Sequence, residues 1–516
     1  MSPLLATLIG QADSFNRPDI DWHAIAPELT LLAVGAIVTL LDVILLERGK
    51  RLSPTIAGIG LLVVLIPIIT LAVDGVASNP RDALAPYGVY IVDGYSLILK
   101  AVFILIAYVV VLLSTNYIAE GDYWESEYYG MLLSSVLGMV VMASARDLVT
   151  VFVALELLSI PAYLMATWRK RDLRSNEAGL KYYLNGVFAS ALMLYGMSLL
   201  FGVSGSTVLA DINDSLTGST GETALVSLGI VLVIVGFAFK VSAVPFHLWA
   251  PDTYEGSPTP VTAFLAVAAK GAGFVALMNL VFVGFANREE VYAPALWILA
   301  VATMTVGNLT ALRQNNLIRL MAYSGVAQAG FMLAALAVAG EEGVSQTSVS
   351  AVVTYLIIYA AMNLGAFAVI LTVARRTESA EISSFNGLFQ WSPALAVIMT
   401  IFLASLAGIP PLGGWYAKFG VFTALIEADV WWAYVLAAFA AVNTVIAFGY
   451  YGKLASRMWF EDAPTEFETS PIRVPFALQA ALGLTVVSTV AFGVYPAMVT
   501  HFSDVDLPAI AAAAGG

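Results

Sequence analysis

Long apolar stretches recur along this 516-residue chain and constrain its fold more than any other feature. A helix needs about 20 predominantly apolar residues to cross the hydrocarbon core of a bilayer. Because that core holds no water to satisfy backbone N–H and C=O groups, stretches of this length are expected to be helical. Only 11% of the residues are charged, whereas soluble domains carry about 25%. The chain is therefore predicted to be an all-α polytopic membrane protein.

Fourteen stretches meet the length requirement, and the charge of the loops supports this count. The loops after the odd-numbered helices contain fourteen Lys and Arg residues, whereas the loops on the opposite side contain four. By the positive-inside rule, this asymmetry predicts a plasma-membrane protein with both termini on the outer side. The predicted helices span 27–46, 55–74, 90–113, 128–145, 147–168, 180–203, 223–249, 259–285, 292–312, 317–339, 348–374, 391–427 (broken), 430–452 and 475–500.

The composition also excludes several classes of function. The chain has no cysteine, which excludes disulfides and Cys-ligated iron–sulfur or zinc sites. No phosphate-binding glycine motif follows a strand-like run, so nucleotide binding has no support. The net charge of −13 argues against nucleic acid as a partner. We therefore predict no cofactor and no metal in this chain, and the lipid bilayer as its surroundings.

Four charged residues interrupt otherwise apolar spans: Glu156, Lys240, Lys270 and Lys418. A charged side chain at the centre of a bilayer costs at least about 2.5–3.5 kcal/mol, so such residues usually mark ion or proton pathways. Lysine suits proton transfer because burial readily removes its proton, whereas arginine stays charged. Glu156 lies about 14 Å into its helix and needs a cation, for which Lys240 is the natural partner. A static Glu–Lys pair that only holds helices together is the alternative.

Proline interrupts two of the spans close to these lysines. One break contains Pro245, shortly after Lys240, and the other contains Pro410 and Pro411, shortly before Lys418. Proline removes a backbone donor and leaves carbonyl groups that need a partner or water. Broken helices at corresponding places in two halves of a chain indicate inverted repeats with an ion site between them.

Several other residues are weaker candidates for a proton relay. His247 lies seven residues after Lys240 and either passes protons toward Lys270 or caps the helix end. Tyr254, with Asp252 and Glu255, is expected in a solvated loop between helices 7 and 8. On the second-half side, the residues expected to hold water are Tyr323, Ser324, Gln328, Tyr359 and Asn363.

Two further lysines have local partners in the sequence. Lys181 follows Glu177 at i,i+4 spacing, which favours an ion pair at the start of helix 6. Lys181 is also deep enough to be a second partner for Glu156. Lys100 in helix 3 is expected either to pair with Asp93 or to have a functional role.

Several sequence blocks occur in order through helices 4–13: Ala154-Leu-Glu156-Leu-Leu-Ser-Ile-Pro-Ala-Tyr163, Lys181-Tyr-Tyr183, Lys240-Val-Ser-Ala-Val-Pro-Phe-His247-Leu-Trp-Ala-Pro-Asp252, Ser257-Pro-Thr-Pro-Val-Thr-Ala-Phe-Leu265, Lys270, Gln314-Asn-Asn-Leu-Ile-Arg319-Leu-Met-Ala-Tyr-Ser324 and Gly408-Ile-Pro-Pro-Leu-Gly-Gly414. Together they resemble the antiporter-like subunits of respiratory complex I, the proton-translocating NADH:quinone oxidoreductase. The N-type subunit fits best. The M-type is expected to have glutamate at the place of Lys418, and the L-type continues into a long lateral helix.

The resemblance implies a fold of two inverted five-helix repeats, helices 4–8 and 9–13, with helices 7 and 12 broken. It also implies protons driven outward by NADH:quinone oxidation elsewhere in the complex, with NADH, FMN, iron–sulfur clusters and quinone in partner subunits. Other membrane subunits, especially an M-type and a small K-type, are the implied partners. The corresponding segments are 1–127 (helices 1–3), 128–285 (first repeat), 286–452 (second repeat) and 453–516 (helix 14 and the tail).

By the same resemblance, Glu156 is the modulating acid and Lys240 the switch on helix 7. Lys270 is then the central relay and Lys418 the terminal lysine of the outer half. One position departs from the family: relatives often have histidine near Gln328, and glutamine holds water but does not titrate. Two other functions remain open: a subunit of a multi-subunit Na⁺/H⁺ antiporter, and a structural subunit that transmits conformation without conducting ions.

Overall fold

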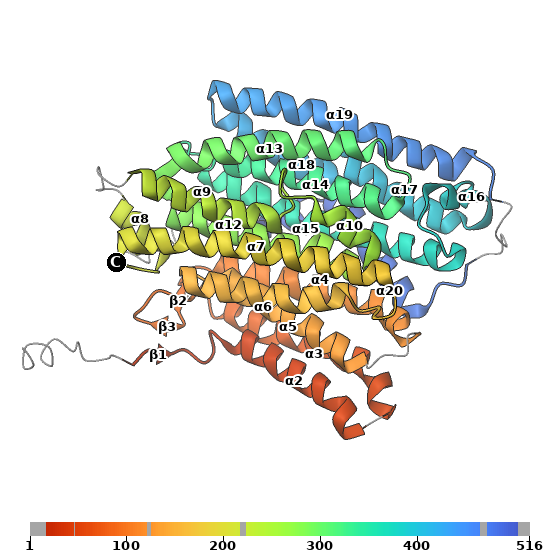
Figure 1. The fold of residues 1–516 in the computed structure, drawn as a ribbon, viewed down its shortest axis with the longest axis horizontal. Helices are drawn as coiled ribbons and strands as arrows, with labels where there is room; N and C mark the ends of the chain where they lie inside the picture. Colours follow the sequence, from red (N-terminus) through yellow and green to blue (C-terminus); the bar gives the residue numbers. More distant parts are fainter. Residues whose placement is uncertain (1–16, 46, 121–124, 217–222, 465–471, 504–516) are drawn as a thin grey trace, which may run out of the picture.

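The computed structural model is a bundle of helices that run side by side, with two short strand pairs near one end (Figure 1). It describes residues 17–45, 47–120, 125–216, 223–464 and 472–503. Helices α2 (Ala26–Leu45) and α3 (Glu47–Val73) form one edge of the bundle, and α19 (Trp431–Phe460) forms the opposite edge. The helical architecture predicted from the apolar stretches is confirmed.

Within the described ranges, eleven helices are long and apolar enough to cross a membrane. Three further apolar helices are shorter, and they lie where the sequence predicts helices 1, 7 and 12: Ala26–Leu41, Ala224–Lys240 and Pro393–Ala407. The chain is therefore a polytopic membrane protein. Two of the shorter helices end where the helix is interrupted by the prolines described above.

The N-terminal part packs α2 and α3 against α4 (Gly94–Ala119) and α5 (Glu125–Ser144). Asp93 is the N-cap of α4 and forms a capping box with Ser96, whose N–H donates to the Asp93 carboxylate at 2.7 Å. Two antiparallel strand pairs lie beside these helices: β1 (Asp19–Ile20) with β3 (Leu84–Ala85), and β2 (Arg81–Asp82) with β4 (Ile91–Val92).

The next part of the chain contains the helices that surround Glu156, Lys240 and Lys270. Asp147 caps the first of them after α5, accepting from the N–H groups of Val149 and Thr150. The elements are α6 (Leu148–Ala166), α7 (Leu173–Ser204), α8 (Leu209–Leu216), α9 (Thr223–Lys240), α10 (Trp249–Gly256), α11 (Thr259–Phe264), the π-helix η1 (Leu265–Ala269), α12 (Lys270–Asn279), the π-helix η2 (Leu280–Gly284) and the 3₁₀ turn η3 (Ala286–Arg288).

The last part surrounds Lys418, and α15 lies at its centre, packed against α14, α17, α18 and α20. Nearly all of the apolar window of α15 is buried, which is why its sequence is apolar on every face. The elements are α13 (Glu289–Ala311), α14 (Leu317–Ala337), α15 (Ser345–Thr377), η4 (Ile382–Phe385), α16 (Leu388–Trp391), α17 (Pro393–Ala407), α18 (Gly413–Glu427), α19, α20 (Phe476–Val494) and α21 (Ala497–Ser503).

Both predicted helix breaks are present. Helix α9 ends at Lys240, and Pro245 and His247 lie in the segment before α10. Helix α17 ends at Ala407, and Pro410 and Pro411 lie in the segment before α18. Gly408 begins the second break with φ of +92°, a backbone conformation that side chains disfavour. The lysines differ in position: Lys240 precedes its break, whereas Lys418 lies within the helix after its break.

One loop assignment from the sequence is wrong. Asp252, Tyr254 and Glu255 lie on the two-turn helix α10 and not in a loop. Pro251 is compatible with this helix because it lies in the first turn of α10, where its missing N–H has no intrahelical acceptor. Tyr254 is fully buried.

Of the two alternatives for Lys100, the pair with Asp93 is wrong. The Lys100 ammonium lies 2.7 Å from Glu28 Oε1, in a contact between α4 and α2 that is fully buried on the lysine side. Tyr90 donates a hydrogen bond to the same Glu28 oxygen, at 2.7 Å. Asp93 is unavailable to Lys100 because it caps α4 and pairs with Arg146 at 2.9 Å.

Removing one partner of the Glu28–Lys100 pair is expected to destabilise the chain more than replacing both partners with apolar residues. Glu28→Leu leaves a buried ammonium without its carboxylate, at a cost of about 3–5 kcal/mol. The double variant Glu28→Leu/Lys100→Met removes both charges and is expected to recover most of this loss. Thermal unfolding in detergent measures both effects, and equal losses in the single and double variants would contradict this account.

Candidate functional site

Lys240 lies at the C-terminal end of α9 and points into a buried polar site between α6 and α7. Its ammonium donates to Ser159 Oγ at 2.8 Å and to Tyr182 Oη at 3.3 Å. Ser159 donates its own proton to the Leu155 carbonyl at 2.6 Å, so its oxygen is free to accept from the lysine. The ring of Tyr182 stacks on Trp249 with centroids 4.4 Å apart. Both acceptors of Lys240 are therefore neutral and held in place.

Glu156 lies one helical turn before Ser159 on α6, near enough for its carboxylate to interact electrostatically with Lys240. Its closest hydrogen-bond donor is Ser190 Oγ on α7, at 2.6 Å. Among the described residues, no ion pair joins Glu156 to Lys240 within 4.0 Å. The direct Glu156–Lys240 pair expected from the sequence is thus open in this structure, with Ser159 and Ser190 holding the two groups separately.

Lys270 begins α12 directly after the π-helical turn η1, and it is 1% exposed. Its ammonium donates to the Gly325 carbonyl of α14 at 2.8 Å. Gly325 leaves room for this contact, because a Cβ atom there would lie 3.1 Å from the ammonium and 2.9 Å from Tyr359 Oη. An alanine at this point would force the ends of these two side chains to shift slightly.

Lys418 on α18 is buried beside the second helix break. Its ammonium donates to the Ala407 carbonyl at 2.9 Å and lies 5.0 Å from the centroid of the Phe331 ring. Ala407 is the last residue of α17, where carbonyl groups lack intrahelical donors and carry partial negative charge. The break therefore supplies the acceptor that a continuous helix would have used internally.

The weaker relay candidates lie either near the first helix break or in the second half of the chain. The ring of His247, in the first break, lies 6.2 Å from that of Tyr323 on α14. Tyr254 on α10 accepts at its carbonyl from Thr262, at 2.8 Å. Tyr359 accepts from Asn363 on its own helix, also at 2.8 Å.

Gln328 occupies a buried polar cluster next to Lys418. Its amide donates to the Leu406 carbonyl at 3.1 Å, and Leu406 directly precedes the acceptor of Lys418. Tyr355 donates to Gln328 Oε1, and Tyr451 accepts from its amide at 3.3 Å. Glutamine thus links three elements around Lys418 without offering a titratable group.

Sequence reasoning missed the direct partners of Lys240 and Glu156, which are Ser159, Tyr182 and Ser190, and the partners of Gln328, which are Tyr355 and Tyr451. The spacing of Ser159, three residues after Glu156, places the two on one helix face and was a usable signal. The tyrosines gave no such signal, because a buried tyrosine within an apolar helix is most often a packing residue.

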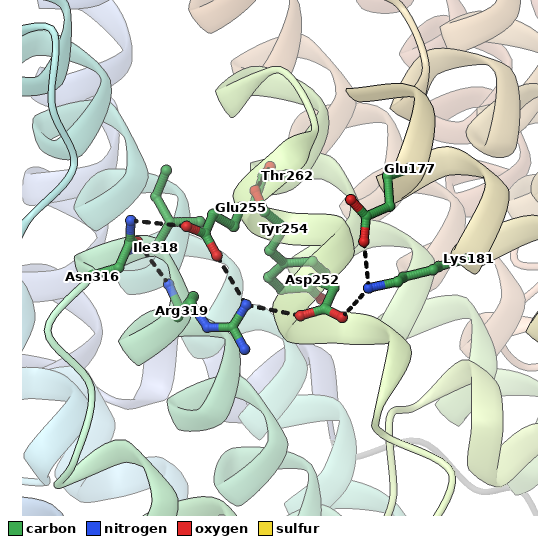
Figure 2. Close-up of polar contacts among 9 residues, drawn as sticks. All are labelled: Glu177, Lys181, Asp252, Tyr254, Glu255, Thr262, Asn316, Ile318 and Arg319. Atoms are coloured by element: carbon green, nitrogen blue, oxygen red, sulfur yellow. Dashed lines mark hydrogen bonds and ion pairs between the residues drawn. The ribbon is translucent and has the colours of Figure 1, made fainter. Parts of the chain in front are cut away.

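A surface network of ion pairs joins α7, α10 and the start of α14 (Figure 2). Lys181 forms the expected pair with Glu177 at 2.7 Å, and it also contacts Asp252 Oδ2 at 2.7 Å. The other oxygen of Asp252 lies 2.8 Å from Arg319. Lys181 therefore pairs with neighbours at its own end of α7 and not with Glu156, since Ser190, the donor to Glu156, lies about 13 Å further along the helix.

Within the described residues, no group of three or more His, Asp or Glu side chains is arranged to hold a metal ion. The site therefore consists of the half-buried Glu156 carboxylate, three buried lysines and neutral hydrogen-bonding groups. Such a set of residues can hold and transfer protons along helix–helix contacts that lie inside a membrane-spanning bundle.

The chain belongs to the family of membrane subunits described as NADH:quinone oxidoreductase/Mrp antiporter, whose model matches residues 145–444. Within it, the chain is similar to NADH-quinone oxidoreductase subunit N of Trichlorobacter lovleyi, at 36% identity over 488 residues that cover 94% of this chain and 96% of that protein. The resemblance to N-type subunits is confirmed.

Solved structures agree with this assignment. A chain of respiratory complex I from Thermus thermophilus with bound aureothin is 31% identical and has a TM-score of 0.73, with coverage of 92% of this chain and 98% of that one. A chain of the Mrp complex from Dietzia is 22% identical with a TM-score of 0.80, over 96% and 97% of the two chains. The second likeness shows a shared fold only.

The Asp252 carboxylate gives a pH-dependent prediction, because it lies outside the candidate spans. Burial alone would raise the pKa of Asp252, but hydrogen bonds and charges from Lys181 and Arg319 outweigh it and hold this pKa below its ordinary value. A carboxyl group with a lowered pKa in the folded state adds stability above its unfolded pKa, and this stability is lost as the pH falls through the folded pKa.

Asp252→Asn is therefore expected to lower stability at pH 7 by about 1 kcal/mol or less, since the pairs are partly exposed. The difference from the wild type is expected to shrink as the pH falls below about 4. Thermal unfolding in detergent over a pH series checks this. A difference that stays constant through the acid range would show that the ion pairs do not cause it.

Proposed function

We propose that this chain is the proton-translocating N-type membrane subunit of an NADH:quinone oxidoreductase, driven by quinone reduction in other subunits. One observation carries the proposal: within the described part of the chain, three buried lysines donate only to neutral oxygens. The acceptors are Ser159 and Tyr182 for Lys240, the Gly325 carbonyl for Lys270 and the Ala407 carbonyl for Lys418. Static ion pairs would have locked these ammonium groups in their charged form.

The Glu156–Lys240 pair is the proposed switch. Moving one charge across 150–200 mV costs about 3.5–4.6 kcal/mol. A Glu–Lys pair at 4 Å contributes about 4 kcal/mol at an effective dielectric constant of 20. Opening and closing this pair therefore changes the energy of the Lys240 proton by about the amount that pumping requires. Ser159 and Ser190 hold the open arrangement, from which a small movement of α6 against α9 closes the pair.

The remaining candidates extend this switch into a path. We infer that Lys270 relays protons from Lys240 across the middle of the bundle and that Lys418 is the terminal group. His247, Tyr254 and Tyr323 lie around the first break, and Tyr359 and Gln328 lie on the second-half side. Gln328 is assigned to water binding, because it does not titrate. Lys181 is assigned to the ion-pair network of Figure 2 rather than to the path.

The proposed arrangement in the membrane follows the loop charges. It has fourteen crossings, both termini on the outer side of a bacterial inner membrane, and inverted repeats at 128–285 and 286–452, preceded by 1–127 and followed by 453–516. An M-type and a K-type subunit are the proposed neighbours, and NADH, FMN, iron–sulfur clusters and quinone are assigned to other subunits. The shared fold of the Mrp chain keeps a cation/proton antiporter as the second candidate function.

Native purification of the tagged chain in mild detergent is the first test of this assignment. We expect it to co-purify in a very large assembly that oxidises NADH. Recovery with only a few membrane subunits and no NADH oxidation would overturn the proposal in favour of the antiporter. The same four charged residues would then be tested for sodium-dependent exchange.

Substitution of the switch residues is expected to impair coupled turnover without preventing assembly. Glu156→Ala removes the charge that modulates Lys240, and Lys240→Ala removes the proton carrier itself. We expect Lys240→Ala to lower proton pumping roughly tenfold or more, by analogy with the loss of a general acid–base group. Proton uptake by membrane vesicles during NADH oxidation measures this.

Lys453→Ala is the matched control for these variants, because Lys453 is an exposed lysine on α19. It is expected to pump like the wild type. Full pumping by either Glu156→Ala or Lys240→Ala would contradict the proposed switch.

Lys418 tests whether the terminal position needs lysine or only a titratable group. Lys418→Ala is expected to abolish pumping through this chain. Lys418→Glu is expected to retain part of it, because a protonated carboxyl group still donates to the Ala407 carbonyl. If both variants are inactive, the ammonium group itself is required. If both pump like the wild type, this position lies outside the path.

A further inference from the structure

The ion-pair network of Figure 2 centres on one carboxylate that has no role in the proton path described above. Asp252 on α10 divides its two oxygens between two helices. Oδ2 lies 2.7 Å from the Lys181 ammonium of α7, and Oδ1 lies 2.8 Å from the Arg319 guanidinium of α14. These groups line a cavity of about 330 Å³ at this end of the bundle.

The α7 contact leads directly to Lys240. Lys181 is followed by Tyr182, whose hydroxyl accepts from the Lys240 ammonium. The same helix carries Ser190, which donates to Glu156. A shift of α7 therefore changes both the acceptor of Lys240 and the donor to Glu156.

The α14 contact leads to Lys270. Arg319 lies six residues before Gly325, whose carbonyl accepts from the Lys270 ammonium. Tyr323 lies between them in sequence, with its ring beside that of His247. Asn316 fixes the start of this helix, accepting from the N–H groups of Ile318 and Arg319. A shift at the start of α14 therefore reaches the acceptor of Lys270.

We propose that Asp252 is a positioning residue that couples the Lys240 and Lys270 sites by tying α7 and α14 to the short helix α10. Only two turns long, α10 is connected to Lys240 through the first helix break, so it moves as a small rigid unit between the two longer helices. When the break changes shape around Lys240, Asp252 transmits the displacement to the start of α7 and of α14 together.

The lowered pKa of Asp252 agrees with this role, because a permanently ionised group does not relay protons at neutral pH. It serves instead as a fixed anion. The inference rests on the proposed proton path, since it assigns how two steps of that path are linked.

The chain provides two matched controls for Asp252. Glu177 contacts Lys181 and, among the described residues, forms no ion pair with α14, whereas Glu255 contacts Arg319 at 2.9 Å on the other side. Each control carboxylate is exposed to a similar or greater degree than Asp252. Glu177→Gln therefore weakens one arm of the network, Glu255→Gln weakens the other, and only Asp252→Asn cuts both.

The test compares these variants in the intact complex. Asp252→Asn is expected to lower the ratio of protons pumped to NADH oxidised by at least about twofold, within the range found for coupling residues, while the complex still assembles. Asp252→Glu is expected to restore most of the ratio, and Glu177→Gln and Glu255→Gln are expected to stay near the wild type. A wild-type ratio in Asp252→Asn, or an equal fall in all three carboxamide variants, would overturn the proposal.

Two further variants keep the proposal testable if Asp252→Asn does not assemble. Lys181→Gln and Arg319→Gln each break one arm and leave Asp252 in place, so each is expected to lower the ratio, and wild-type ratios in both would overturn the coupling.

Lys240→Ala distinguishes failure of the proposed coupling from failure of the proton path itself. If Lys240→Ala pumps fully, the path is wrong; if it does not pump and Asp252→Asn does, only the coupling is wrong.

Discussion

The structure depends on how it accommodates ammonium groups in a medium that cannot solvate them. A buried lysine without a counter-charge keeps its proton only if oxygen atoms replace its water shell. The chain supplies these oxygens from side chains of neighbouring helices, from one carbonyl within α14 and from one helix end. The α17 break frees the Ala407 carbonyl for Lys418, and the α9 break places Lys240 at a helix end facing Ser159 and Tyr182. At Lys240 and Lys418, the helix breaks therefore allow protein oxygens to take the place of water around the ammonium group.

Two kinds of buried lysine occur among the described residues, and they differ in the charge of their partners. Lys100 lies 2.7 Å from Glu28, and Tyr90 binds the same carboxylate, so this pair is fixed and ties α2 to α4. Lys240, Lys270 and Lys418 have neutral acceptors, which leave the ammonium group free to lose its proton. Burial alone does not distinguish these cases; the charge of the acceptor does.

The sequence predicted a polytopic helical fold, both helix breaks and the burial of Lys240, Lys270 and Lys418, because each depends on local composition. Apolar length and proline position are properties of a single stretch of chain. The contacts were harder to predict, since they depend on which helix faces which. Lys100 pairs with Glu28, 72 residues away, and not with the nearby Asp93. Glu156 accepts a hydrogen bond from Ser190 and does not pair directly with Lys240. Helix α10 was missed because two turns give too little periodicity to recognise.

The acceptors of the lysines also differ in how substitution can reach them. Ser159 and Tyr182 are side chains, so exchanging them removes a hydrogen bond to Lys240 directly. Lys270 and Lys418 instead donate to the main-chain carbonyls of Gly325 and Ala407, which every amino acid retains. An alanine scan would therefore remove the acceptors of the first lysine, whereas at Gly325 and Ala407 the acceptor carbonyls stay in place because the path of the backbone supplies them.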